Sequence, residues 1–160
     1  MIRRTAVLAL LVSSAVLFTG CATVPAPEAM RAEIAGFSLP KKPESGQAMV
    51  YVVRPSSLGA LIRFNVFLND QEPKSEVGYT RGGQHIFFAV PPGTHRILSK
   101  AENWAEVQVT LKAGEVAFIQ QDPSMGVIMA RNTLLVVDEV TGTYQVKKTN
   151  LGTLLPAEKK

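Results

Sequence analysis

The chain has 160 residues, of which 46% are hydrophobic, and a formal net charge of +4. Its basic residues form no stripe interleaved with aromatic side chains, which argues against nucleic acid as a partner. It contains one cysteine, so neither an internal disulfide nor a cysteine-rich metal site is expected, and no cofactor is predicted.

The first twenty residues have the three-part layout of a secretory signal. Arg3 and Arg4 precede an uncharged apolar run over 5–19, and small residues lead from this run to Cys21. As a helix, this run spans only ~22 Å, which is less than the ~30 Å hydrocarbon core of a bilayer. We therefore expect a signal peptide over 1–20 and not a permanent transmembrane helix.

The sequence F-T-G-C at 18–21 resembles the lipobox of bacterial lipoproteins. Thr19 and Gly20 match the small or hydroxyl residues that the family has before its cysteine, whereas Phe18 stands where leucine is usual. The resemblance implies cleavage after Gly20, diacylglyceryl transfer to the sulfur of Cys21, and acylation of the new amino terminus, typically with palmitate. Several acyl chains on one residue give stable membrane anchoring. The alternative is a plain secretory signal with an incidental cysteine.

The residue after the cysteine bears on the destination of the protein. In lipoproteins of this kind, aspartate at that position tends to retain the protein at the inner membrane. Ala22 therefore implies the outer membrane of a Gram-negative cell, with the domain on the periplasmic side. Residues 21–45 contain four prolines and are predicted to be a lipidated tether. Within it, 27–35 is compatible with two helical turns, since Pro27 stands near the start and Gly36 just past the end.

From Ala48 onward, short apolar runs alternate with turn signals about every 8 to 12 residues, which is typical of an all-β sandwich. We expect an immunoglobulin-like domain over 46–150, with roughly seven to nine mostly antiparallel strands, and a frayed tail over 151–160. The run 48–54 is apolar at almost every position and is predicted to be covered on both faces. The segment 141–148 is ambiguous. The expected strands are 48–54, 61–68, 76–80, 84–90, 94–100, 104–111, 116–122, 126–130 and 133–138.

A hairpin is predicted around Pro91-Pro92-Gly93-Thr94. This sequence fits a type II turn, with proline at the second position and glycine at the third, where a positive φ is needed. The strands on either side should then pair with each other. Alternation along the expected strands predicts the following core residues: Ile62, Phe64, Val66, Leu68, Ile86, Phe88, Val90, Val107, Val109, Leu111 and Phe118.

Several motifs of the predicted domain resemble known families. The stretches FNVFLND, VPPGTHRILSK and VQVTLKAGEVAFI are similar to the PEGA-type β-sandwich, in which such strands and turn recur in that order. A fuller resemblance is to a family of bacterial lipoproteins known only as a domain of unknown function. Its motifs are V-Y-V-x-R-P-S at 50–56, F-N-V-x-L at 64–68, V-P-P-G-x-H at 90–95 and M-G-V…A-R at 125–131. The resemblance implies a PEGA-like sandwich module on a lipid anchor, with no established activity.

Candidates for catalysis or metal binding are few. His85 and His95 lie on the two strands of the predicted hairpin, about 17 Å apart along the strands. Ligands of one metal ion must lie within ~2.2 Å of it, so the two histidines are not expected to share a site. No G-x-S-x-G motif is present, and the carboxylate pair Asp70 and Glu72 falls in a turn. We therefore predict no enzyme activity, catalytic residue or metal site.

Phe67 and Phe87 are predicted to point away from the core, because their neighbours in the alternating pattern point inward. The outer face of an open sandwich normally carries polar residues. Two explanations therefore stay open. The rings are covered by the same chain, through the tether or the C-terminal strand, or they form a docking face for a partner or a second copy.

The expected function is non-catalytic. The sequence indicates a lipid-anchored module of the bacterial envelope that faces the periplasm and mediates protein interaction or envelope assembly. The alternative is a binder or carrier of a small apolar or glycan ligand. Trp104, the only tryptophan, begins an expected strand; we expect it to cap the edge of the core, the alternative being an exposed binding face.

Overall fold

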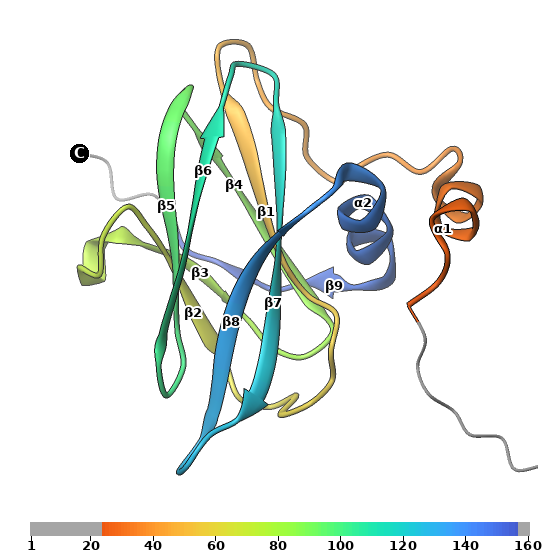
Figure 1. The fold of residues 1–160 in the computed structure, drawn as a ribbon. Coiled ribbons are helices and arrows are strands. Elements are labelled where there is room, and N and C mark those ends of the chain that lie inside the picture. Colours follow the sequence, from red (N-terminus) through yellow and green to blue (C-terminus); the bar gives the residue numbers. More distant parts are fainter. Residues whose placement is uncertain (1–23, 157–160) are drawn as a thin grey trace, which may run out of the picture.

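Strand β1 (Ala48–Arg54) lies at the centre of the fold. The computed structural model describes residues 24–156 (Figure 1), and all seven residues of β1 are buried. β1 pairs antiparallel with β4 (Gln84–Val90) and parallel with β7 (Val116–Met125), so it has a neighbour on each edge. The prediction of a strand covered on both faces is confirmed.

Within residues 24–156, ten strands form two five-stranded sheets, here named sheet A and sheet B. Sheet A has the order β8 (Ala130–Val137), β7, β1, β4 and β9 (Asn150–Leu151). Sheet B has the order β10 (Thr153–Leu154), β3 (Glu76–Thr80), β2 (Phe64–Leu68), β5 (Gly93–Lys100) and β6 (Trp104–Leu111), with a short 3-10 turn, η1 (Pro73–Ser75), before β3. The pairs β1–β7 and β4–β9 are parallel and the others antiparallel. The predicted all-β, mostly antiparallel sandwich is confirmed.

The core between the two sheets is built from alternate residues that point inward. Its buried members are Ala48, Val50, Val52, Val66, Ile86, Val90, Ile97, Val109, Leu111, Ala117 and Ile119. Leu68, Phe88 and Val107 pack against this cluster, as predicted. Ile62 was wrongly predicted to be core, because it lies in the loop before β2 and is 36% exposed. The alternation of the strand begins only at Phe64.

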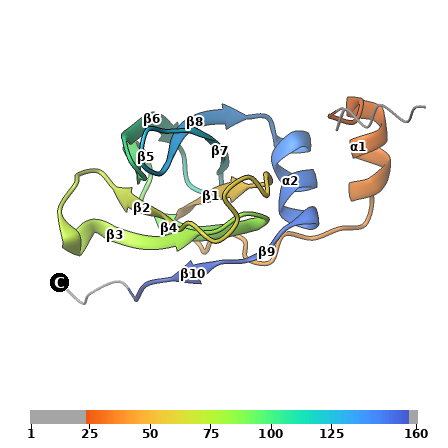
Figure 2. The ribbon, with the colours of Figure 1, turned by 90° about the horizontal axis from the view of Figure 1, so that it is seen from below.

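A second apolar cluster lies on the outer face of sheet A. It consists of Met49, Tyr51, Val53, Phe118 and Val146, with Phe37, Leu39, Phe87, Val116 and Val137 packed against it. Helix α2 (Glu139–Lys148) supplies Val146 and covers this face, and α1 (Pro27–Ile34) packs on α2 (Figure 2). This face therefore belongs to the folded core of the protein.

Helix α2 occupies a segment whose structure was ambiguous in the sequence. The side chain of Asp138 accepts a hydrogen bond from the Thr141 N–H at 3.0 Å, which caps the start of the helix. Gly142 lies directly against Phe118, where an added Cβ would come within 2.1 Å of the ring. A glycine in the interior of a helix is unfavourable by itself. Gly142 is explained by the close approach of α2 to sheet A, which leaves no room for a side chain at this position.

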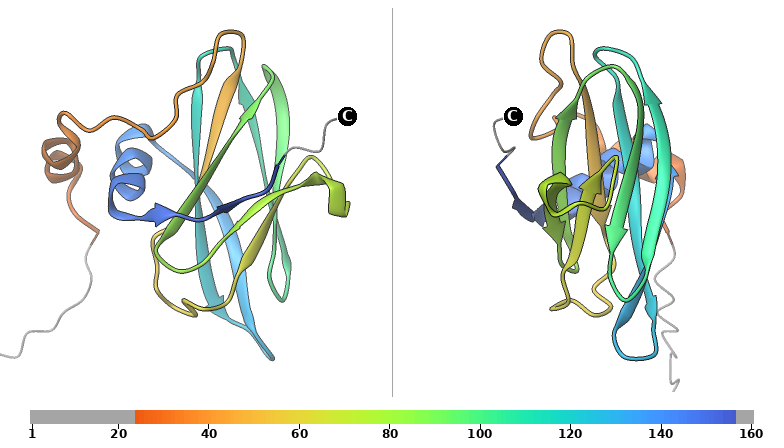
Figure 3. Two further views of the ribbon diagram at one scale, coloured as in Figure 1. Left: turned by 180° about the vertical axis from the view of Figure 1, so that it is seen from behind. Right: turned by 90° about the vertical axis from the view of Figure 1, so that its left-hand side faces the viewer.

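The predicted frayed tail over 151–160 is wrong for its first part. β9 pairs with β4 and β10 pairs with β3, so residues 150–154 join the edges of both sheets. Figure 3 shows this segment running from α2 across β4 toward β3. Gly78 makes room for it, since a Cβ there would lie 2.3 Å from the carbonyl oxygen of Thr153.

One predicted turn and one predicted strand differ in the structure. β4 belongs to sheet A and β5 to sheet B, so the Pro91-Pro92 segment carries the chain between sheets and is not the turn of a hairpin. The predicted strand 126–130 is mostly a loop, because β7 runs on to Met125 and β8 starts at Ala130. At Pro91-Pro92-Gly93 the turn-forming sequence was recognised, but the strands that it joins do not pair with each other. At 126–130 the apolar run connects β7 with β8 and is not a separate strand.

The predicted tether is partly docked on the domain. Helix α1 lies within the stretch expected to make two helical turns, and that prediction is confirmed. The Tyr51 hydroxyl donates to the Lys41 carbonyl at 2.6 Å and accepts from the Lys41 N–H at 2.9 Å. The segment from Phe37 to Lys41 is therefore held against sheet A and α1 against α2, so residues 27–41 are not a free spacer.

Candidate functional site

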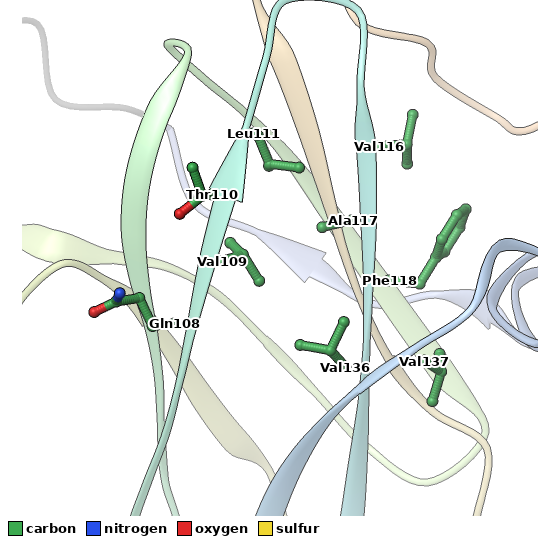
Figure 4. A pocket seen from close by; sticks show the side chains of 9 residues that line it. All are labelled: Gln108, Val109, Thr110, Leu111, Val116, Ala117, Phe118, Val136 and Val137. Atoms are coloured by element: carbon green, nitrogen blue, oxygen red, sulfur yellow. The ribbon is translucent and has the colours of Figure 1, made fainter.

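The sandwich stays open between β6, the edge of sheet B, and β8, the edge of sheet A. A cleft of about 360 Å³ lies there. Figure 4 shows Val109 and Leu111 of β6 across the gap from Ala117 of β7 and Val136 of β8. The residues that line it are Gln108, Val109, Thr110, Leu111, Val116, Ala117, Phe118, Val136 and Val137. None of these nine described residues carries a charge.

The exposed fraction of Val136 shows that the two sheets separate at the cleft. Alternation along β8 puts Asn132, Leu134 and Val136 on the side that faces sheet B. Asn132 is only 1% exposed and Leu134 packs on the core, but Val136 is 46% exposed. An apolar side chain that points into the sandwich is thus left open to solvent at one end of the strand.

The main chain of β8 also faces the opening. The Asn103 side chain accepts from the Asn132 N–H at 2.8 Å and donates to the Asn132 carbonyl at 2.9 Å, so the backbone of Asn132 points away from β7. In an antiparallel pair every second residue points to the same side, so the backbone groups of Leu134 and Val136 point outward as well. Among residues 24–156, no strand pairs with this edge of β8.

A larger groove lies on the opposite side of the sandwich, between β4 and the strands β2 and β3. Its volume is about 680 Å³. Apolar side chains of both sheets and of the C-terminal segment line it, with several polar residues. These residues are Gln47, Leu68, Asn69, Asp70, Lys74, Ser75, Glu76, Val77, Phe87, Phe88, Ala89, Leu154, Leu155 and Pro156.

Phe67 and Phe87 do not form one face, because β2 belongs to sheet B and β4 to sheet A. Phe67 is 7% exposed, and its ring lies 5.1 Å from that of Trp104. Phe87 is half-buried, and its ring lies 5.4 Å from that of Tyr51 in the cluster to which Phe37 also belongs. Of the two explanations left open, cover by the same chain therefore holds for Phe67, and the two rings do not share one face. Phe87 is only partly covered and also lines the groove beside β4.

The predicted lipidation residue, Cys21, lies outside the described residues.

The two histidines are on different sheets. The Nδ1 atom of His85 lies 2.9 Å from the Thr149 hydroxyl, and burial lowers the pKa of this imidazole. His95 Nε2 lies 2.8 Å from the Pro91 carbonyl oxygen. Within residues 24–156, no group of three or more His, Cys, Asp or Glu is placed to hold a metal ion.

The cleft was not identified from the sequence. The run TLLVVD at 133–138 indicated a strand, but nothing in it marks that strand as an edge.

Neither of the two described helices is long and apolar enough to cross a membrane.

Comparisons with known proteins give a family and one relative. Residues 44–134 match the family described as "Protein of unknown function (DUF2846)". An uncharacterized protein of Haemophilus influenzae is 23% identical over 142 residues, which cover 88% of this chain and 81% of that protein. The matched region runs from just before β1 into β8 and so includes most of both sheets.

Proposed function

The chain belongs to the DUF2846 family, and we propose that it is a non-catalytic protein-interaction module of the bacterial envelope. Lipid on Cys21 holds it to the outer membrane, and the sandwich faces the periplasm. A partner protein adds an extended segment to the open edge of β8, in the cleft beside β6. The observation that carries this proposal is the exposure of the inward-facing Val136 on β8, an edge strand whose outer edge is unpaired within residues 24–156.

Two kinds of contact would hold such a segment. The outward backbone groups of Leu134 and Val136 supply main-chain hydrogen bonds, as in other proteins that bind peptides by strand addition. The apolar wall of Val109, Leu111 and Ala117 takes an alternate side chain of the partner. Asn103 already occupies the edge at Asn132, so the free part of β8 covers 133–137, or ~17 Å of extended chain.

The chemistry of the partner segment follows from the lining. Because the nine residues around the cleft are uncharged, recognition depends on main-chain hydrogen bonds and apolar contact. Such binding is screened little by salt. We therefore expect an uncharged apolar segment of about five residues, with capture that persists at high ionic strength.

Site-specific crosslinking in cells tests the proposal. A photoreactive amino acid at Val136 lies in the cleft, whereas one at the neighbouring Leu135, which is 58% exposed, points to the other face of the same strand. Crosslinks to a protein from position 136 and not from 135 support the proposal. Val136→Lys should abolish crosslinks from a probe at Gln108 across the cleft without changing the melting temperature. Equal crosslinking from both positions of β8, or none, would refute it.

The anchor has its own test. Cys21→Ser should leave uncleaved precursor, and Ala22→Asp should move the protein from the outer to the inner membrane in a fractionation. Normal processing of the Cys21→Ser chain would remove the lipid anchor from the proposal, and an unchanged distribution of the Ala22→Asp chain would remove the outer membrane.

The groove beside β4 favours a second candidate function, the binding of a small apolar or glycan ligand. Its volume of about 680 Å³ falls within the range of ~300–1,000 Å³ that is usual for ligand sites. Phe88, Leu68 and Val77 supply apolar walls there. Native mass spectrometry of the purified chain should then show a bound small molecule, which Ala89→Trp, at an exposed position of the lining, should displace.

A further inference from the structure

One end of the sandwich carries a set of uncovered aliphatic side chains, here named the loop end. It consists of the β1–β2 loop (55–63), the β5–β6 loop (101–103) and the tip of the β7–β8 hairpin (125–131), which lie together at the bottom of Figure 1. A Cβ on Gly59 would lie 3.8 Å from the Ala130 Cβ, which places the first loop against the hairpin. The exposed large apolar residues of the loop end are Leu58, Leu61, Ile62, Met125, Val127, Ile128 and Met129.

The hairpin tip is held in shape by a carboxylate. Glu102 accepts hydrogen bonds from the N–H groups of Val127, Ile128 and Met129, at 3.1, 2.8 and 2.8 Å. These bonds lower the pKa of Glu102 to about 2. Three consecutive backbone donors are thus satisfied from one side, and the aliphatic side chains of Val127 and Ile128 are 90% and 89% exposed.

The β1–β2 loop is held by a buried cation. Arg54 is 0% exposed, and its guanidinium donates to the carbonyls of Leu58, Gly59 and Ile62 at 2.7, 3.0 and 2.7 Å. The same group lies 3.9 Å above the ring of Phe64. Three carbonyls of the first loop and three N–H groups of the hairpin tip are therefore paired within the protein, which lowers the cost of moving them into a medium with little water.

Basic side chains surround these aliphatic residues. Arg63 ends the first loop, Arg131 is the last residue of the hairpin tip, and Arg81 donates to the Leu61 carbonyl at 3.4 Å. Lys100 stands at the start of the β5–β6 loop. The nearby carboxylates are Glu102, which is bonded to the tip, and Asp122, which accepts from Gln120. Together with the buried Arg54, five cations against two carboxylates leave this end positive.

We propose that the loop end docks on the surface of an anionic phospholipid bilayer, with Val127 and Ile128 entering the apolar layer and the arginines contacting lipid phosphates. Three features favour a bilayer as the occupant. The hairpin tip projects outward, its exposed side chains are aliphatic, and the positive charge around it complements anionic head groups. A second copy of the chain would bring the same positive charge to the contact and is disfavoured. The cleft between β6 and β8 is a different surface, so this inference does not depend on the proposed function.

A fluorescent probe at the hairpin tip tests this docking. The full chain with Cys21→Ser has no native cysteine, and flotation of the vesicles checks that every variant is bound before its spectrum is read. NBD is attached to Val127→Cys, or to the control Ala113→Cys in the exposed β6–β7 turn at the other end of β6. In vesicles of phosphatidylglycerol and phosphatidylcholine, the probe at 127 should shift to the blue and lose intensity when nitroxide groups are placed on the lipid chains. The probe at 113 should do neither.

The role of charge is tested in the same assay. Vesicles of phosphatidylcholine alone, and the double variant Arg63→Gln with Arg131→Gln, should reduce the shift and the quenching at 127. A probe at 127 that stays in water on anionic vesicles would overturn the inference and leave the loop end to a protein partner. Equal signals at 127 and 113 would overturn it too, since they indicate adsorption without orientation. Equal signals on both kinds of vesicle would overturn the requirement for anionic lipid.

Discussion

The outer face of sheet A and the loop end both present large apolar side chains, but only the first is covered. Phe118 on sheet A is 2% exposed, because α2 and the segment with Phe37 and Leu39 lie on that face. Ile128 at the loop end is 89% exposed, and nothing in residues 24–156 lies over it. The same kind of side chain thus has two different roles in one small domain.

The two regions also differ in what holds them together. The covered face is held by apolar packing, with Gly142 of α2 directly against the Phe118 ring. The loop end is held by charged groups, with Arg54 bonded to carbonyls and Glu102 bonded to N–H groups. Apolar residues that do not contribute to packing are free to contact something else, and exposed apolar patches commonly mark contact sites. Four predictions test this difference.

The largest effect is expected for Phe118→Ala on the covered face. The ring is buried and lies 5.6 Å from that of Tyr51, so its removal leaves a cavity and should lower the free energy of unfolding by ~3–5 kcal/mol. Urea denaturation measures this. Phe67→Ala, which removes a ring packed on Trp104, is the matched change on sheet B and should cost a similar amount. A loss below ~1 kcal/mol would mean that α2 does not cover this face in solution.

A smaller effect, with an informative sign, is expected for Gly142→Ala. Helix propensity alone predicts that this change stabilises α2 by up to ~1 kcal/mol. In the structure the new Cβ would lie 2.1 Å from the Phe118 ring, so we expect a loss of ~1–3 kcal/mol from overpacking. Thr143→Ala, at the next position of the helix, is the control. A stabilised Gly142→Ala chain would show that α2 packs less closely than described.

A local effect is expected at Glu102. Because its pKa is lowered to about 2 from an ordinary value of 4.5, its stabilising contribution is present above pH 4.5 and is lost as the pH falls toward 2. The amide resonances of Val127, Ile128 and Met129 should titrate with a midpoint near pH 2. Glu102→Gln should speed hydrogen exchange at these three amides at neutral pH. Glu115→Gln, which also removes a carboxylate bonded to a backbone N–H, should not.

The smallest effect is expected for Val127→Ser and Ile128→Ser. Both side chains are almost fully exposed, so the free energy of unfolding should stay within ~0.5 kcal/mol of its original value. The same urea denaturation measures it. A loss comparable to that of Phe118→Ala would show that the loop end is covered, and the contrast between the two regions would disappear.

Strand pattern and strand partners differ in how far they could be predicted from the sequence. The continuous apolar run of β1 and the alternation of β6 are local signals, and both strands were predicted with the correct bounds. The assignment of β4 and β5 to different sheets is not local, because the Pro91-Pro92-Gly93 sequence suits a tight turn as well as a crossing between sheets. The cleft depends on which strands form the edges and so was missed as well.

The sequence by itself determined that this chain forms a β-sandwich, and it determined most of the strands and the core. Each of those features depends on side chains that alternate within one segment, and alternation is visible in the sequence. Only the tertiary structure decided that 139–148 is a helix, that Phe67 and Phe87 lie on different sheets, and that Val136 and Ile128 are open to solvent. These features depend on contacts between segments far apart in the chain. Phe118, for example, determines the close packing of α2, and Glu102 determines the shape of a loop more than twenty residues away.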